Sequence, residues 1–129
     1  MKSIPLILLL FALVITAVIP CSALELLERD HGRDFTINLG EELVIRLPGN
    51  PTTGYLWEVA ANDSAVLKQK GETVFVADAD RIGAGVQSIF RFVPRRVGSA
   101  ILKLVYHRPW EKEMPPVKVF AVVVTVKQE

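Results

Sequence analysis

Two histidines, His31 and His107, are the side chains of this sequence best suited to act as general bases near neutral pH. His31 lies in a short polar stretch before an apolar run, which is typical of a turn. His107 ends an alternating apolar run and is typical of a residue at the rim of a fold. No base stands beside the hydroxyl pair Thr52 and Thr53, and there is no nucleophile-elbow motif. The sequence therefore favours a binding protein over an enzyme.

The spacing of the possible metal ligands does not indicate a metal site. No His, Asp or Glu pattern is typical of a zinc site, and no acidic loop matches a calcium-binding hand. Asp78 and Asp80 place two carboxylates in one loop, and we interpret them as solvated charges, with a weak calcium site as the alternative. We expect neither a metal nor a cofactor.

The stretch 50–57 reads Asn-Pro-Thr-Thr-Gly-Tyr-Leu-Trp and separates two apolar runs. Pro51 fixes its own φ and keeps the preceding Asn out of the α region, which predicts a turn. Thr52 and Thr53 are β-branched and favour extended backbone, and Gly54 permits a positive φ before the next strand. The pattern predicts a stiff, protruding turn with two hydroxyls near its tip, suited to binding; a decorated hairpin turn is the alternative.

Alternating apolar and polar residues surround this turn and predict the strands that hold it. The alternation or β-branched character covers residues 24–29, 35–39, 43–47, 55–59, 66–76 (two short strands or one bent strand, broken near Gly71), 89–93, 100–106 and 117–126. No segment has sustained helical periodicity. About eight short strands separated by turns favour an all-β, immunoglobulin-like two-sheet β-sandwich with Greek-key connections.

Three loops of the expected sandwich are long, namely 48–54, 77–88 and 108–116. Greek-key connections place alternate loops at the same end, so we expect the three to cluster there. Trp57 falls on the inward face of its strand and is predicted to be a core residue. Trp110 follows a proline in a polar loop without an obvious core, so contact with a partner is the better interpretation.

Residues 1–23 have the form of a secretory signal peptide. Lys2 precedes an apolar run over 4–19, and small residues follow, with cleavage predicted after Ala23. A retained membrane anchor is one alternative. A lipoprotein acylated at Cys21 is another, although the residues before Cys21 match a lipobox poorly.

The expected mature chain, 24–129, has 106 of the 129 residues, enough for one domain with its own core. Loss of Lys2 turns 15 basic and 14 acidic side chains into 14 of each, so no excess charge attracts nucleic acid or an acidic membrane. The single cysteine, Cys21, is lost as well, which excludes a thiol nucleophile and a disulfide. We expect a secreted, periplasmic or cell-surface protein, bound to a membrane only if Cys21 is lipidated.

Three of the loops carry distinctive motifs: Asn50, Pro51, Thr52, Thr53, Gly54 and Tyr55 in the first, Gly83, Ala84 and Gly85 in the second, and Arg108, Pro109 and Trp110 in the third. Together these motifs resemble the chagasin family, secreted inhibitors of papain-like cysteine peptidases. The resemblance covers roughly 35–126. Val86 departs from it, because the family has a glycine at this place.

The resemblance implies a monomeric, reversible, tight-binding inhibitor whose loops occlude the active-site cleft of a papain-family peptidase. Thr52 would lie near the catalytic histidine, while Asn50 and Thr53 brace the first loop. The second loop would pair as an added strand along the non-primed side. Trp110 would lie against an aromatic surface on the primed side, at an angle fixed by Arg108 and Pro109.

Two alternatives come from other classes of protein. An adhesion or carbohydrate-binding sandwich would use Trp110 as a stacking platform. A structural domain of a cell envelope is the second alternative, and it would require Cys21 to be lipidated.

Overall fold

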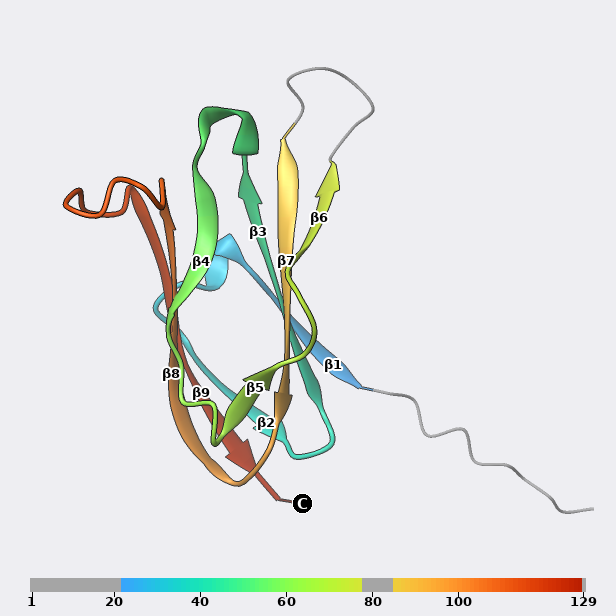
Figure 1. Cartoon of the computed structure of the whole chain (residues 1–129). Coiled ribbons are helices and arrows are strands. Elements are labelled where there is room, and N and C mark those ends of the chain that lie inside the picture. Colours follow the sequence, from blue (N-terminus) through green and yellow to red (C-terminus); the bar gives the residue numbers. More distant parts are fainter. Residues whose placement is uncertain (1–21, 78–84, 129) are drawn as a thin grey trace, which may run out of the picture.

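The computed structural model describes residues 22–77 and 85–128, which form two β-sheets packed face to face (Figure 1). The strands are β1 (Ala23–Leu27), β2 (Asp34–Asn38), β3 (Glu42–Gly49), β4 (Leu56–Ala61), β5 (Leu67–Gln69), β6 (Val74–Ala77), β7 (Val86–Pro94), β8 (Gly98–His107) and β9 (Lys118–Lys127). Two short 3-10 turns, η2 (Glu28–Asp30) and η3 (Pro51–Thr53), lie between them. The predicted all-β, immunoglobulin-like sandwich is confirmed, and within the described residues no helix is long and apolar enough to cross a membrane.

The first sheet has the order β1-β3-β7, and both β5 and β6 pair along the remaining edge of β7. β1 runs parallel to β3, whereas the other pairs are antiparallel. Gly71, with a φ of 70°, lies between β5 and β6. Residues 66–76 therefore form two short strands and not one bent strand.

The second sheet has the order β2-β9-β8-β4, with β2 parallel to β9. The chain passes from the first sheet to the second at η2, where the Asp30 carboxylate accepts a hydrogen bond from the Leu27 N–H at 2.8 Å. His31 follows, and its Nδ1 accepts a hydrogen bond from the Ala121 N–H of β9 at 2.9 Å. His31 therefore holds a turn before a strand, as predicted.

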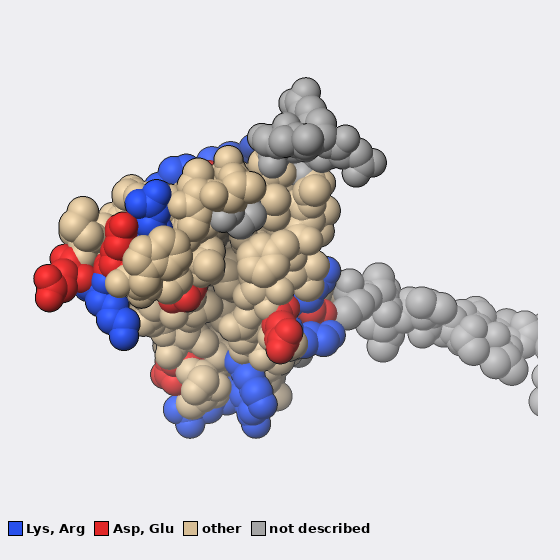
Figure 2. All heavy atoms as spheres, turned by 45° about the horizontal axis from the view of Figure 1, so that its top comes forward, with Lys and Arg blue, Asp and Glu red and all other residues tan. Residues whose placement is uncertain are grey.

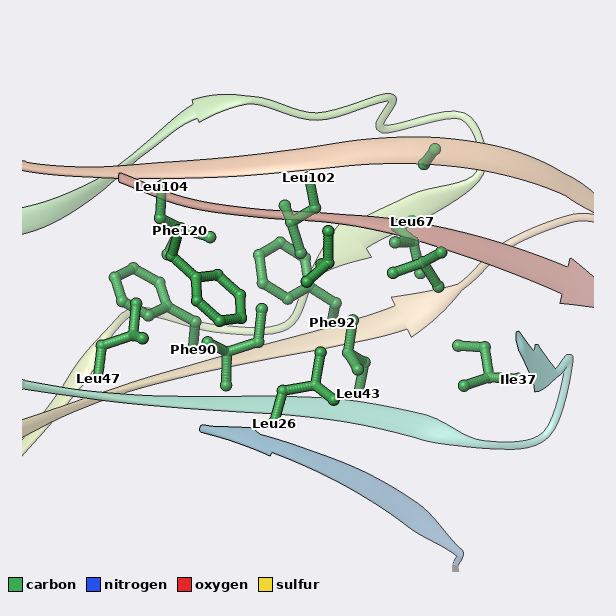
Figure 3. Close-up of a cluster of buried hydrophobic side chains, with 14 of the residues drawn as sticks. Leu26, Ile37, Leu43, Leu47, Leu67, Phe90, Phe92, Leu102, Leu104 and Phe120 are labelled. Atoms are coloured by element: carbon green, nitrogen blue, oxygen red, sulfur yellow. The ribbon is translucent and has the colours of Figure 1, made fainter. Parts of the chain in front are cut away.

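The core lies between the two sheets and is built from alternate residues of their strands (Figure 3). The largest fully buried side chains are Phe90, Phe92, Phe120, Leu26, Ile37, Leu43, Ile45, Leu47, Leu67, Leu102, Leu104 and Val124. Full burial of a Leu or Phe side chain stabilises a fold by about 1.5–3 kcal/mol. The described domain therefore holds its strands in place by packing, with no disulfide among them.

The connections from β3 to β4, from β6 to β7 and from β8 to β9 leave the sheets at the same end of the sandwich (Figure 1). The predicted clustering of the three loops is thus confirmed for the ends of the strands that carry them. The middle loop is shorter than predicted, because β6 extends to Ala77 and β7 already begins at Val86. Val86 pairs with Gly49 on one side and Ala77 on the other, so it is a strand residue and not part of a glycine loop.

Candidate functional site

The first loop is a compact 3-10 turn, η3, and the predicted extended backbone at Thr52 and Thr53 is wrong. Asn50 stands at the position of an N-cap, where its side-chain Oδ1 accepts a hydrogen bond from the Thr52 N–H at 3.2 Å. The Thr53 N–H donates to the Asn50 carbonyl oxygen, also at 3.2 Å. Pro51 fits the first helical position, because its φ is fixed and no N–H is needed there. Capping by Asn and Pro therefore outweighs the extended preference of the two threonines.

Both threonine hydroxyls donate hydrogen bonds within the same turn. Thr52 Oγ1 donates to Asn50 Oδ1 and Thr53 Oγ1 donates to the Asn50 carbonyl oxygen, each at 2.6 Å. Thr52 and Thr53 are nevertheless exposed. The turn is thus stabilised from within, and the lone pairs of Thr52 Oγ1 stay open to a donor from outside.

Tyr106 of β8 attaches this turn to the sandwich. Its hydroxyl accepts a hydrogen bond from the Asn50 N–H at 2.9 Å. Its ring lies 5.5 Å from the ring of Tyr55 and 5.1 Å from that of Trp57, measured between centroids. Trp57 is buried, as predicted, and its Nε1–H donates to the Pro48 carbonyl oxygen at 3.0 Å. Buried aromatic rings therefore support both ends of the first loop.

Arg108, at the start of the third loop, links that loop to the first. Its Nε–H donates to the Thr53 carbonyl oxygen at 3.1 Å, and its guanidinium carbon lies 4.4 Å from the centre of the Tyr55 ring. Its NH1 group pairs with Glu111 Oε1 at 3.2 Å, and the Glu111 N–H bonds back to the Arg108 carbonyl oxygen at 3.0 Å. Arg108 thus ties the third loop to the first, while its part in setting the angle of Trp110 against a partner stays a prediction.

Trp110 lies over Gly54, so the two loops also meet through their tips. The indole is 66% exposed, as predicted for a residue outside the core. Gly54 has a φ of 84°, and a Cβ built on it would stand 3.1 Å from Cζ2 of Trp110 and closer still to Cη2. Only a residue without a side chain allows the indole to rest there. The two loops form one braced surface with Trp110 on its outside.

Of the second loop motif, only Gly85 is among the described residues. Gly83 and Ala84 lie outside the described residues, as do Asp78, Asp80 and Cys21. Gly85 is half-buried and comes directly before β7.

Neither histidine lies beside the threonine hydroxyls. His107 Nε2 is 3.0 Å from Glu58 Oε2, and His31 bonds to β9 as described above.

Within the described residues no group of His, Cys, Asp or Glu side chains could hold a metal ion. The sequence analysis assigned no role to Glu111 or Tyr106. For Tyr106 the available signal was a Tyr at an inward strand position next to the third loop.

The sandwich presents two cross-braced, exposed loops at one end, an arrangement suited to binding a partner. A model of the chagasin family, described as chagasin family peptidase inhibitor I42, matches residues 36–124. The chain belongs to this family, which is a family of inhibitors and not of enzymes.

A curated relative agrees with this assignment, and two solved structures share the fold. Chagasin of Trypanosoma cruzi is 32% identical over 84 residues, which cover 62% of this chain and 76% of that protein. The structure of the cysteine protease inhibitor EhICP2 from Entamoeba histolytica is 24% identical, with a TM-score of 0.72, covering 82% of this chain and 96% of that one. PbICP-C, solved in complex with falcipain-2, has a TM-score of 0.53 at 19% identity, covering 82% of this chain and 99% of that one.

Proposed function

We propose that this protein is a secreted, reversible inhibitor of papain-like cysteine peptidases that blocks the active-site cleft with its loops. The observation that carries the proposal is the braced pair of exposed loops, in which Thr52 and Trp110 point to solvent from a fixed frame. Solved structures with this fold include a cysteine protease inhibitor and PbICP-C in complex with falcipain-2.

In this proposal the first loop enters the cleft at the catalytic cysteine and histidine of the peptidase. Thr52 Oγ1 donates to Asn50, so its lone pairs can accept a hydrogen bond from that histidine. Trp110 lies against an aromatic surface on the primed side, and Gly83, Ala84 and Gly85 approach the non-primed side. Little conformational entropy is lost on binding, because hydrogen bonds already fix the first and third loops.

The 3-10 turn also gives a reason why the inhibitor is not cleaved as a substrate. Hydrolysis needs a peptide bond that reaches attack geometry, with the reacting atoms about 3–3.5 Å apart. The peptide bonds over 50–54 are held in a turn by the hydrogen bonds within η3. A peptidase would have to break these hydrogen bonds before it could extend the loop into a substrate-like form.

We expect the unmodified exported protein to inhibit papain in titration. Activity should return on dilution, and mass spectrometry should find neither an acyl-enzyme nor a cleaved loop, because the chain binds without a covalent step. A matched titration against trypsin, a serine peptidase, is the control. Full papain activity at a large molar excess of the protein would contradict the proposed function.

Export is the second part of the proposal, with residues 1–23 removed after Ala23. The intact mass of the exported protein should correspond to 24–129, and inhibition should be insensitive to reducing agents, because no cysteine remains. The Ser22 carbonyl oxygen accepts a hydrogen bond from the Glu42 N–H at 3.1 Å, one contact that this cleavage would remove. A lipid mass on Cys21 would contradict both the cleavage site and the soluble form.

A further inference from the structure

Strand β6 exposes three consecutive apolar side chains. Val74, Phe75 and Val76 are 48%, 56% and 43% exposed. Among the described strands β6 pairs with β7 alone, so its other edge is open. Edge strands usually carry a charge, a proline or a bulge that prevents pairing with another chain, and β6 has no such residue between Val74 and Ala77. The strand has the properties of a docking edge.

The pairing of β6 with β7 and of β7 with β3 places the end of β6 level with the first loop. Ala77 pairs with Val86 of β7, and Val86 pairs with Gly49 of β3, the residue directly before Asn50. β6 runs toward the end of the sandwich where the braced loops lie (Figure 1). The face that Figure 2 turns forward is mainly uncharged, with charged side chains gathered around its rim. β6 is therefore adjacent to the proposed contact surface.

The three side chains divide between the two faces of the strand. Phe75 pairs with Ser88, whose side chain is buried between the sheets, so Phe75 projects from the inner face of the first sheet. Val74 and Val76 pair with Ile89 and Gln87 and project from the outer face. A partner seated along β6 would meet apolar surface on both sides of its backbone edge.

A second copy of this chain is poorly suited to pair with the open edge of β6. A stable interface needs about 20–30 residues on each side, whereas β6 offers four residues, or about 13 Å of strand. The rest of the β7 edge is already taken by β5. β6 is too small to bind alone and suits a partner that the neighbouring loops already hold.

We propose that β6 is an additional contact element for the target peptidase, in which Phe75 is the main apolar anchor and the open strand edge lies against the peptidase beside its cleft. This inference rests on the proposed function. It assigns to β6 the strand-like pairing that the family resemblance implied for the glycine loop.

The test compares Phe75→Ser with Val97→Ser in the otherwise unmodified protein. Val97 is 53% exposed and lies in the turn between β7 and β8, at the other end of the sandwich. Phe75→Ser should raise the inhibition constant for papain about tenfold or more, as expected for loss of an apolar anchor. Val97→Ser should stay within about twofold, because exposed sites away from an interface contribute little. Both variants should melt within a few degrees of the unmodified protein.

Each outcome decides the assignment. Val76→Ser repeats the test on the outer face of β6. It replaces Phe75→Ser if that variant has a clearly lowered melting temperature. Unchanged inhibition constants for both β6 variants would overturn the role of β6 and leave the proposed function intact. A concentration-dependent dimer that Phe75→Ser dissociates, seen by sedimentation of the protein alone, would assign the edge to a second copy instead. Failure of the unmodified protein to inhibit papain would overturn the proposed function, and this inference with it.

Discussion

Replacing Trp110 by Ala should raise the inhibition constant for papain about thirtyfold while leaving the fold intact. The indole is 66% exposed and rests on Gly54, outside the core, so its removal opens no cavity between the sheets. An exposed Trp at the centre of an interface typically contributes about 2 kcal/mol or more when truncated. About 1.4 kcal/mol corresponds to a factor of ten in affinity, which gives the expected change. Inhibition constants and thermal melts of the same preparations measure both effects.

Trp57→Ala is the control, because it removes the same side chain from the core. Trp57 is 3% exposed, donates a hydrogen bond to the Pro48 carbonyl oxygen and packs against Tyr106. Its loss should decrease the free energy of unfolding by about 3–5 kcal/mol. The assignment of Trp110 fails if Trp110→Ala unfolds the protein and the folded fraction keeps its full affinity, because the indole is then structural.

The strands could be predicted from the sequence because burial imposes a period of two. Leu43, Ile45 and Leu47 alternate in the sequence, and all three are fully buried. Strand ends were harder to place, because Ala77 and Val86 carry no such pattern and are held by pairing with each other. The sequence suggested a loop over 77–88, and pairing across the sheet shortened it from both sides.

The first loop shows where local preferences conflict. Thr52 and Thr53 favour extended backbone, yet the Asn-Pro pair before them is also an N-cap followed by a first helical position. The cap prevails, because Asn50 satisfies the N–H of Thr52 and both hydroxyls find acceptors. The Asn-Pro capping signal is present in the sequence, but the prediction of extended backbone followed the two β-branched threonines instead.

The bracing between the loops could not be derived from local patterns. The bond from Arg108 to the Thr53 carbonyl oxygen joins residues 55 positions apart, and it depends on the alignment of β4 with β8. The third-loop Trp could be assigned to the surface from its polar neighbours, but its seat on Gly54 could not. Only the fold brings these residues together.

Replacing Gly54 by Ala should weaken inhibition at least as much as the loss of the indole. Gly54 has a φ of 84°, where a side chain costs about 1–2 kcal/mol. The new Cβ would also stand 3.1 Å from Cζ2 of Trp110 and closer to Cη2, so the indole must leave its seat. The change therefore disturbs the first loop and displaces the indole that we propose contacts the peptidase. We expect a rise of about thirtyfold or more in the inhibition constant.

Two comparisons separate the clash from the backbone strain. Gly32→Ala introduces a side chain at a φ of 83° with nothing within 4 Å, so it should reduce stability and leave the inhibition constant unchanged. In the Trp110→Ala background there is no indole to displace, so Gly54→Ala should raise the inhibition constant far less than it does in the unmodified protein. Residues in contact are expected to be non-additive in this way, with coupling of about 0.5–3 kcal/mol. Additive effects of the two substitutions would show that the contact between Gly54 and Trp110 does not position the indole for binding.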